Sequence, residues 1–331
     1  MQRNALNSGR LFAGWLPLRN FIEITSIVVL LAGCQARSSA QQKGQKSFPS
    51  AEAASQALVT AAQNNDEKSM EEILGPDSKE IISSGDQTED AQNRAEFVQR
   101  YQEMHRLVKE PDGTTTLYAG AENWPLPIPL KNKGNVWYFD TPAAKKEILY
   151  RRIGRNEIST IRVCQELVAA EKEYYQSHDH EYAQNIISDE GKQDGLYWKV
   201  AEGQPQSPIG PLVASAVAEG YVPTPDSSRS TPYRGYFYRV LDGQGAGAHG
   251  GTRSYLVNGK MTRGFAFLAF PAEYRSSGVM TFIVGENGVV YRKDLGANTL
   301  TLAKAIKSYN PDSSWTKDED QQEEAAAPQR P

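Results

Sequence analysis

Few side chains in this sequence have both the type and the spacing that chemistry requires. The chain of 331 residues contains two cysteines and four histidines, and it lacks the G-x-S-x-G and H-E-x-x-H motifs of common hydrolases and zinc proteases. Cys34 is the exception, because it directly follows Leu31-Ala32-Gly33 at the end of a short apolar run. We therefore expect modification of the Cys34 thiol to be the best-defined chemistry of this chain.

The residues before Cys34 predict export. Residues 1–20 carry three arginines and no acidic residue, and residues 24–31 form a short, mostly apolar run, which is the layout of a secretory signal. A membrane-spanning helix needs about 20 apolar residues, and Glu23 and Arg37 bound a shorter run. Residues 31–34 resemble the bacterial lipobox. The resemblance implies that residues 1–33 are a signal peptide, that Cys34 carries acyl chains such as palmitate, and that Gln35 directs the protein to the outer membrane, facing the periplasm.

Charge and composition narrow the partners. The net charge is -4, and the basic export segment makes the mature part more acidic still, so we expect no nucleic-acid partner. The expected partners are the membrane, through the anchor at Cys34, and an envelope protein or glycan. The basic residues of one predicted helix should form a solvated face. They are Lys145, Lys146, Arg151, Arg152 and Arg155.

The pattern along the chain predicts an α+β fold. We expect a flexible tether over 34–46, an N-terminal α+β domain over 47–154, a C-terminal domain over 155–316 and a disordered acidic tail over 317–331. The predicted N-terminal elements are helices over 51–63, from 67 and over 89–108, followed by strands that include 114–119 and 136–139. One helix should end at Gly154 and another should run over 157–176. Strands between 236 and 292 predict an antiparallel meander on that helix.

Three resemblances accompany this layout. The helices followed by a small curved sheet resemble nuclear-transport-factor-two-like folds, which implies a concave ligand-holding sheet. Several stretches resemble the bacterial family called domain of unknown function 2950, whose members look exported or lipid-anchored. They include Phe48-Pro49-Ser50-Ala51-Glu52-Ala53, Ile73-Leu74-Gly75-Pro76, Arg151-Arg152-Ile153-Gly154-Arg155-Asn156-Glu157, Asp194-Gly195-Leu196-Tyr197-Trp198 and Gly278-Val279-Met280-Thr281-Phe282. The order of Tyr182-Ala183, Gly235-Tyr236-Phe237-Tyr238 and Ala269-Phe270-Pro271 is similar to pilin and pseudopilin heads.

The remaining candidate motifs favour structural interpretations. Gly245 to Gly250 matches G-x-G-x-x-G, but a strand follows it, so a hairpin loop is expected rather than a dinucleotide site. His178-Asp179-His180-Glu181 lacks the ligand spacing of zinc or calcium sites. Cys164 lies in a helical apolar pattern and should be a buried, inert thiol. We therefore predict no metal site and no cofactor.

Two hypotheses about function remain open. The leading one is a binding or structural module without catalytic residues, in which Tyr197 and Trp198 on a proline-stiffened loop bind a partner or a glycan. Alternatively, these two aromatic side chains simply cover the sheet. The rival hypothesis is a hydrolase of envelope polymers that uses carboxylates such as Asp189, Glu190 and Asp194. A converging pair of carboxyl groups in a cleft would favour the enzyme.

Overall fold

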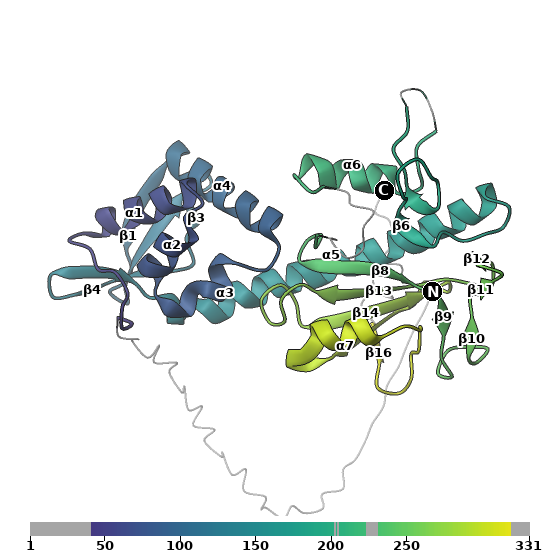
Figure 1. The fold of residues 1–331 in the computed structure, drawn as a ribbon. Helices are drawn as coiled ribbons and strands as arrows, with labels where there is room; N and C mark the ends of the chain where they lie inside the picture. Colours follow the sequence, from purple (N-terminus) through teal and green to yellow (C-terminus); the bar gives the residue numbers. More distant parts are fainter. Residues whose placement is uncertain (1–40, 202, 204, 223–230, 319–331) are drawn as a thin grey trace, which may run out of the picture. The chain divides into compact units, whose positions relative to one another are not determined.

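The computed structural model describes residues 41–201, 203, 205–222 and 231–318 (Figure 1). The predicted signal peptide, Cys34 and residues 319–331 of the predicted acidic tail lie outside the described residues. Within them, the structure is of the mixed α+β class, with N-terminal helices, antiparallel sheets and one long helix. None of the helices in this part of the chain is long and apolar enough to cross a membrane.

The N-terminal half packs short helices against a small antiparallel sheet. The helices are α1 (Ala51–Gln63), α2 (Glu67–Leu74), η1 (Pro76–Ser78), α3 (Lys79–Ile82) and α4 (Gln87–Glu103). The strands are β1 (His105–Lys109), β2 (Thr115–Ala119), β3 (Trp124–Pro125), β4 (Leu130–Lys133) and β5 (Val136–Phe139). They pair in the order β1-β2-β4-β5, with β3 on β2. Their buried side chains form one hydrophobic cluster that includes Leu58, Ile73, Leu117 and Phe139.

Capping residues explain where these helices begin. The side chains of Ser50 and Asp66 accept hydrogen bonds from the backbone N–H groups of Ala53 and Ser69, as expected of N-caps. The predictions for α1 and α2 are therefore confirmed. The prediction of a helix over 89–108 is wrong at its end, because Met104 is extended and 105–109 form β1. Pairing with β2 supplies the backbone hydrogen bonds that continued helix would have supplied.

The end of the predicted tether is packed against this half. Gln45 is buried, and its Nε2 donates to the carbonyl oxygens of Ile73, Leu74 and Phe139 at 3.2, 3.1 and 2.8 Å. A flexible tether would not have a buried side chain with three backbone partners. The described residues 41–46 therefore differ from the prediction of a free linker.

A single helix, α5 (Thr141–Ser177), runs through the predicted boundary at Gly154. The prediction of two helices is therefore wrong. A glycine inside a helix costs only about 1 kcal/mol relative to alanine, and packing on both sides of Gly154 offsets it. Asn156 does not cap a second helix, because its amide Nδ2 donates to the carbonyl of Ser277 at 3.0 Å. The division into domains at 154 remains a prediction.

The C-terminal half is built on an antiparallel meander. Its five-stranded sheet has the order β16-β15-β14-β13-β8. These strands are β8 (Tyr236–Leu241), β13 (Ala266–Pro271), β14 (Met280–Gly285), β15 (Val290–Asp294) and β16 (Thr316–Lys317). The predicted meander is confirmed, with Gly288 at positive φ in the turn between β14 and β15. β16 was not predicted, and its Lys317 begins the predicted tail.

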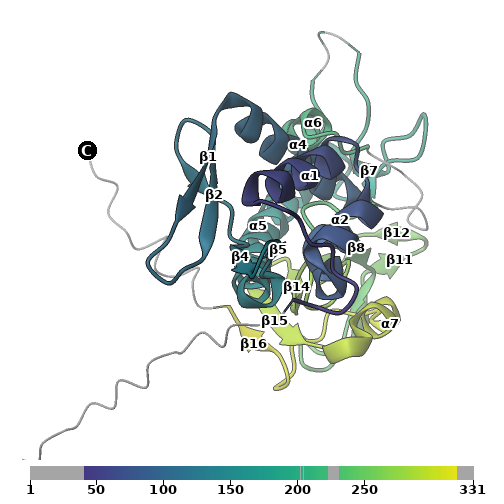
Figure 2. The same ribbon diagram turned by 90° about the vertical axis from the view of Figure 1, so that its left-hand side faces the viewer.

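Helices lie on both faces of this sheet. α5 packs against β13 and β14, whereas α7 (Thr299–Ala305) packs against β13 from the other face (Figures 1 and 2). α6 (Gly210–Ala218) follows a short parallel pair of strands, β6 (Asn185–Ile187) and β7 (Gly195–Tyr197). Two two-stranded pairs complete the fold. They are β9 (Gly243–Gln244) with β10 (Arg253–Ser254), and β11 (Leu256–Val257) with β12 (Lys260–Met261).

Candidate functional site

A groove runs beside strand β8. Its larger part has a volume of about 960 Å³ and is lined by residues of α5, β6, α6, β8 and α7. A second hollow of about 250 Å³ adjoins it and shares four lining residues with it. The shared residues are Gln184, Arg239, Val240 and Lys307. Because six residues of an antiparallel strand span about 20 Å, the two hollows together follow most of the length of β8.

The open edge of β8 faces this groove. β8 is the last strand of its sheet, and only its β13 side is paired along its length. Tyr236 exchanges backbone hydrogen bonds with Tyr233 on the side away from β13. Since backbone groups alternate along a strand, the N–H and C=O groups of Tyr238 and Val240 point to that same outer side. Among the described residues, these four backbone groups have no hydrogen-bond partner.

The wall formed by α5, β6 and α6 is apolar except for Asn185 of β6. Val163 and Leu167 of α5 and Val213 of α6 are buried in the main hydrophobic cluster and contribute to the lining. Ile187 of β6 is half-buried beside them and lies next to β8 without joining its sheet. This side of the groove can therefore accept apolar side chains, whereas polar ones would find few hydrogen-bond partners there.

The α7 wall is basic. Lys304 and Lys307 are exposed and line the groove, and within the described residues neither has a carboxylate partner. Arg239 of β8 donates through Nη2 to the carbonyls of Ala303, at 2.8 Å, and Ile306. It thereby caps the carbonyl end of α7, where a cation is favoured, and fixes the helix beside the groove. Burial lowers the pKa of Arg239.

Two carboxylates also face the groove. Asp242 directly follows β8 and lines the smaller hollow, whereas Glu273 follows Ala272, which is bonded to Gly235 before the start of β8, and lines the larger one. Between these carboxylates, the positive charges of Arg239, Lys304 and Lys307 line the α7 side of the groove. An anionic group bound midway along β8 would therefore meet a favourable potential.

The start of β8 is closed by a buried polar junction. Asp86 is the N-cap of α4, and its Oδ1 accepts from the N–H of Glu89 at 3.1 Å. Its Oδ2 accepts from the Tyr221 hydroxyl at 3.0 Å and from the Gly235 N–H at 2.9 Å. Burial, followed by the charge of Asp86, raises the pKa of Tyr221. The carboxylate of Asp86 thus joins α4, the segment after α6 and the start of β8.

Arg152 extends this junction. Its guanidinium is buried and donates to the carbonyls of Glu80 and Ile81 at 2.8 and 2.5 Å, and to Ser276 Oγ at 3.4 Å. Burial lowers its pKa, and burial raises the pKa of the nearby Asp90. The expectation of a solvated basic helix face is therefore wrong for Arg152. Only the fold shows that the Arg152 side chain faces α3 rather than water.

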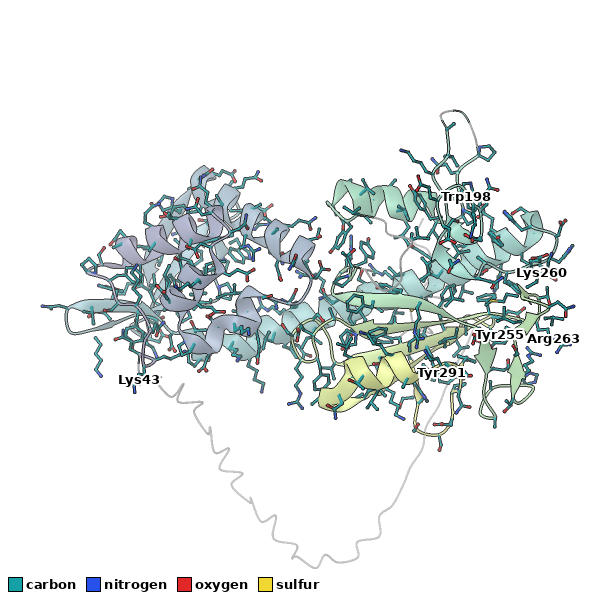
Figure 3. The ribbon with its side chains drawn as sticks, in the orientation of Figure 1. Lys43, Trp198, Tyr255, Lys260, Arg263 and Tyr291 are labelled. Carbon is teal, nitrogen blue, oxygen red and sulfur yellow. The ribbon has the colours of Figure 1, made fainter. Side chains whose placement is uncertain are left out.

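The predicted binding aromatics, Tyr197 and Trp198, do not line the groove. Tyr197 is the last residue of β7, and its carbonyl accepts from the Ser188 N–H at 2.8 Å. The Trp198 ring, labelled in Figure 3, packs edge-on against Tyr174 and His178 with centroid distances of 6.4 and 5.6 Å. Both side chains are half-buried against the main cluster, and neither lines either hollow. Binding by Tyr197 and Trp198 remains a prediction.

The other candidate clusters are dispersed. His178 stacks on Tyr174 and His180 packs on Tyr175, while Glu181 pairs with Lys260, which Figure 3 also labels. No group of three possible metal ligands occurs among the described residues.

The proposed catalytic carboxylates surround a lysine on an exposed turn. Lys192 Nζ lies 2.7 Å from Asp189 and 3.5 Å from Asp194, and Glu190 is exposed beside them. These three acidic residues line neither hollow.

Two structural predictions are confirmed. The glycine-rich segment is the loop between β9 and β10, and the Gly247 N–H donates to Asn310 Oδ1 at 2.7 Å. Cys164 is fully buried, and burial raises the pKa of its thiol to about 12, so it is inert near neutral pH.

Glu171 is a buried carboxyl that the sequence did not single out. It is fully buried on α5, where its Oε2 accepts from the Ala183 N–H at 2.9 Å and its Oε1 has no hydrogen-bond partner among the described residues. Burial raises its pKa to about 8.

Comparison with known proteins identifies a family and no further relative. The family model described as "Protein of unknown function (DUF2950)" matches residues 45–317. The chain therefore belongs to that family, as its motifs predicted. No curated protein and no solved structure matches the chain. The resemblance to pilin and pseudopilin heads, and that to nuclear-transport-factor-two-like folds, accordingly receive no support.

Proposed function

We propose that this member of the DUF2950 family is an envelope lipoprotein that binds a partner in the groove beside β8. The observation that carries the binding role is a 960 Å³ groove with an open strand edge, an apolar wall and a basic wall. Binding sites in proteins are concave, largely apolar and furnished with a few placed polar groups. The groove has these properties.

The anchor in this proposal is Cys34. Its support is the sequence alone, in which a thiol directly follows Leu31-Ala32-Gly33 at the end of an export-like segment. Acyl chains on that thiol would each contribute roughly 0.8 kcal/mol per buried methylene and hold the protein at the outer membrane, facing the periplasm.

Binding is better supported than hydrolysis. A glycosidase-type mechanism needs two carboxyl groups flanking a substrate cleft. Asp189 and Asp194 instead share Lys192 on an exposed turn, outside the groove. The two carboxylates that do line the groove, Asp242 and Glu273, lie beside opposite ends of β8.

The anchor is tested by replacing one atom. Cys34→Ser should abolish the acylated N-terminal peptide in mass spectra and move the protein from the membrane to the soluble envelope fraction. Cys164→Ser is the matched control. Because Cys164 is buried, its replacement should leave acylation unchanged. Identical processing and fractionation of Cys34→Ser and the unmodified protein would remove the anchor from the proposal.

The groove is tested by photo-crosslinking in cells. A photoreactive residue at Leu300, which lines the groove and is 42% exposed, should crosslink to a discrete envelope component. The same residue at Tyr150, which is 75% exposed and lies outside the groove, should not. Equal crosslinking at both positions, or none at Leu300, would contradict a binding role for the groove.

A further inference from the structure

We propose that the occupant of the groove is an extended peptide segment that pairs with β8 as an additional strand and carries alternating apolar and acidic side chains. This inference rests on the proposed binding function and names the chemistry of the partner. It is carried by three observations: an unpaired strand edge, an apolar wall on one side of that edge and a basic wall on the other.

The unpaired backbone groups specify a peptide. The N–H and C=O groups of Tyr238 and Val240 point into the groove and have no partner among the described residues. An added strand would satisfy all four with its own backbone, as in recognition by strand addition. Burying them beneath an acyl chain would instead leave four polar groups unpaired in an apolar setting, which is strongly unfavourable.

The length and composition of β8 suit this role. β8 spans Tyr236–Leu241 and reads Tyr-Phe-Tyr-Arg-Val-Leu, with the four central side chains only half-buried. Proteins usually shorten or charge the exposed edges of sheets, because such edges template pairing with other chains. The opposite edge of this sheet follows that rule, since β16 has only two residues. The β8 edge is longer and includes three aromatic residues and the β-branched Val240.

The two walls specify the side chains of the peptide. Successive residues of a strand point to opposite faces of a sheet. Peptide residues beside Tyr238 and Val240 would face the α5–α6 wall with Leu167 and Val213, and should be apolar. Peptide residues beside Phe237 and Arg239 would face α7 with Lys304 and Lys307, and should be acidic.

The test measures the binding of defined peptides to the full mature chain. A capped seven-residue peptide alternating valine and glutamate should bind, and its valine–lysine counterpart should bind at least about ten-fold more weakly. Replacing the peptide's backbone N–H groups that face β8 with N-methyl groups should also lower the affinity of the valine–glutamate peptide at least about ten-fold. Equal binding of all three peptides would overturn the inference.

Matched variants at one position locate the pairing. Val240→Pro removes an N–H that faces the groove and should lower affinity at least about ten-fold, whereas Val240→Ala keeps the N–H and should lose only a few-fold. Equal losses would contradict backbone pairing. The N-methylated peptide provides the same test without altering the protein, in case Val240→Pro fails to fold.

Further outcomes separate this inference from the proposed function. Dodecanoate that competes with the crosslink at Leu300, together with no binding of the valine–glutamate peptide, would assign the groove to an amphiphile and overturn the peptide inference alone. A crosslinked partner that survives Val240→Pro unchanged would do the same. Loss of both the crosslink and peptide binding in the unmodified protein would overturn both proposals.

Discussion

The backbone groups at the two ends of strand β8 differ in their hydrogen bonding. At its start, the Gly235 N–H meets the buried carboxylate of Asp86, and Tyr236 is bonded to Tyr233. Farther along, Tyr238 and Val240 direct their outer N–H and C=O groups into an open groove. Buried polar groups that are hydrogen-bonded within the protein stabilise the fold. Unpaired backbone groups at an accessible strand edge can instead form hydrogen bonds with another chain. The first region is therefore structural and the second is suited to recognition.

Removing the carboxylate of the junction should have the largest effect on stability. Asp86→Ala leaves the Glu89 N–H, the Tyr221 hydroxyl and the Gly235 N–H without their acceptor. We expect the free energy of unfolding to fall by about 4 kcal/mol, since each unpaired buried donor costs on the order of 1–3 kcal/mol. Urea unfolding followed by circular dichroism measures it.

Asp66→Ala is the matched control for this change. Asp66 also caps a helix through its side chain, but it is exposed and touches only its own first turn. Asp66→Ala should therefore lower the free energy of unfolding clearly less than Asp86→Ala does. Similar losses for the two aspartates would show that capping alone, rather than the junction, accounts for the effect of Asp86.

Gly235→Ala should have the next largest effect. Gly235 has φ +78°, and an added Cβ would lie 2.6 Å from Asn156 Nδ2 and 2.9 Å from Ser277 Cβ. Strain and overcrowding together should cost about 3 kcal/mol. The control is Gly288→Ala, where φ is +74° but an added Cβ would meet no atom of the described residues within 4 Å, apart from its chain neighbours. Thermal unfolding that shifts equally in both variants would refute close packing at the start of β8.

Glu171 tests the cost of a polar group that the core leaves half-paired. Because burial raises its pKa from the ordinary value of 4.5 to about 8, the folded state holds a proton that the unfolded chain releases between these pH values. Stability should therefore fall as pH rises through this interval, by at most about 1.4 kcal/mol per pH unit.

The neutral variant Glu171→Gln isolates this contribution. It should lack that part of the pH dependence, so its stability relative to the unmodified protein should increase from pH 5 to pH 8. Urea titrations at a series of pH values give the difference. Parallel pH profiles for the two proteins would mean that Glu171 is ionised in the folded state.

Charge reversal at Lys304 of α7 and at Lys307, just after that helix, should have the smallest effect on stability. Lys304 and Lys307 are exposed and, within the described residues, have no carboxylate partner, so Lys304→Glu with Lys307→Glu should alter the free energy of unfolding by less than about 1 kcal/mol. The same double variant should reverse the preference between valine–glutamate and valine–lysine peptides. An unchanged preference would remove the basic wall from the account of the groove.

The sequence predicted the parts of the fold that depend on local patterns. N-caps at Ser50 and Asp66, the alternation of β8 and β13 and the Asn287-Gly288 turn all specify elements within a few residues. The helix break at Gly154 was predicted wrongly, because long-range contacts of Arg152 and Asn156 sustain α5 there. Local propensity does not contain those contacts.

The groove could not be predicted in the same way. Tyr236–Leu241 reads as a strand, but its position at the edge of the sheet depends on the pairing order of strands as distant along the chain as β16. Lys304 and Lys307 read as ordinary surface lysines until Arg239 fixes α7 beside β8. Tyr197 and Trp198 were predicted to bind a partner from their residue types alone, and only the fold shows that they pack against the main cluster without lining the groove.

Amide hydrogen exchange at single-residue resolution tests the central claim most directly. In the free protein, the amides of Tyr238 and Val240 should exchange rapidly, whereas those of Phe237 and Arg239, which face β13, should be protected. Adding the valine–glutamate peptide should protect Tyr238 and Val240 selectively. If these two amides are already protected in the free protein, or stay unprotected with saturating peptide, the edge of β8 is not the binding site.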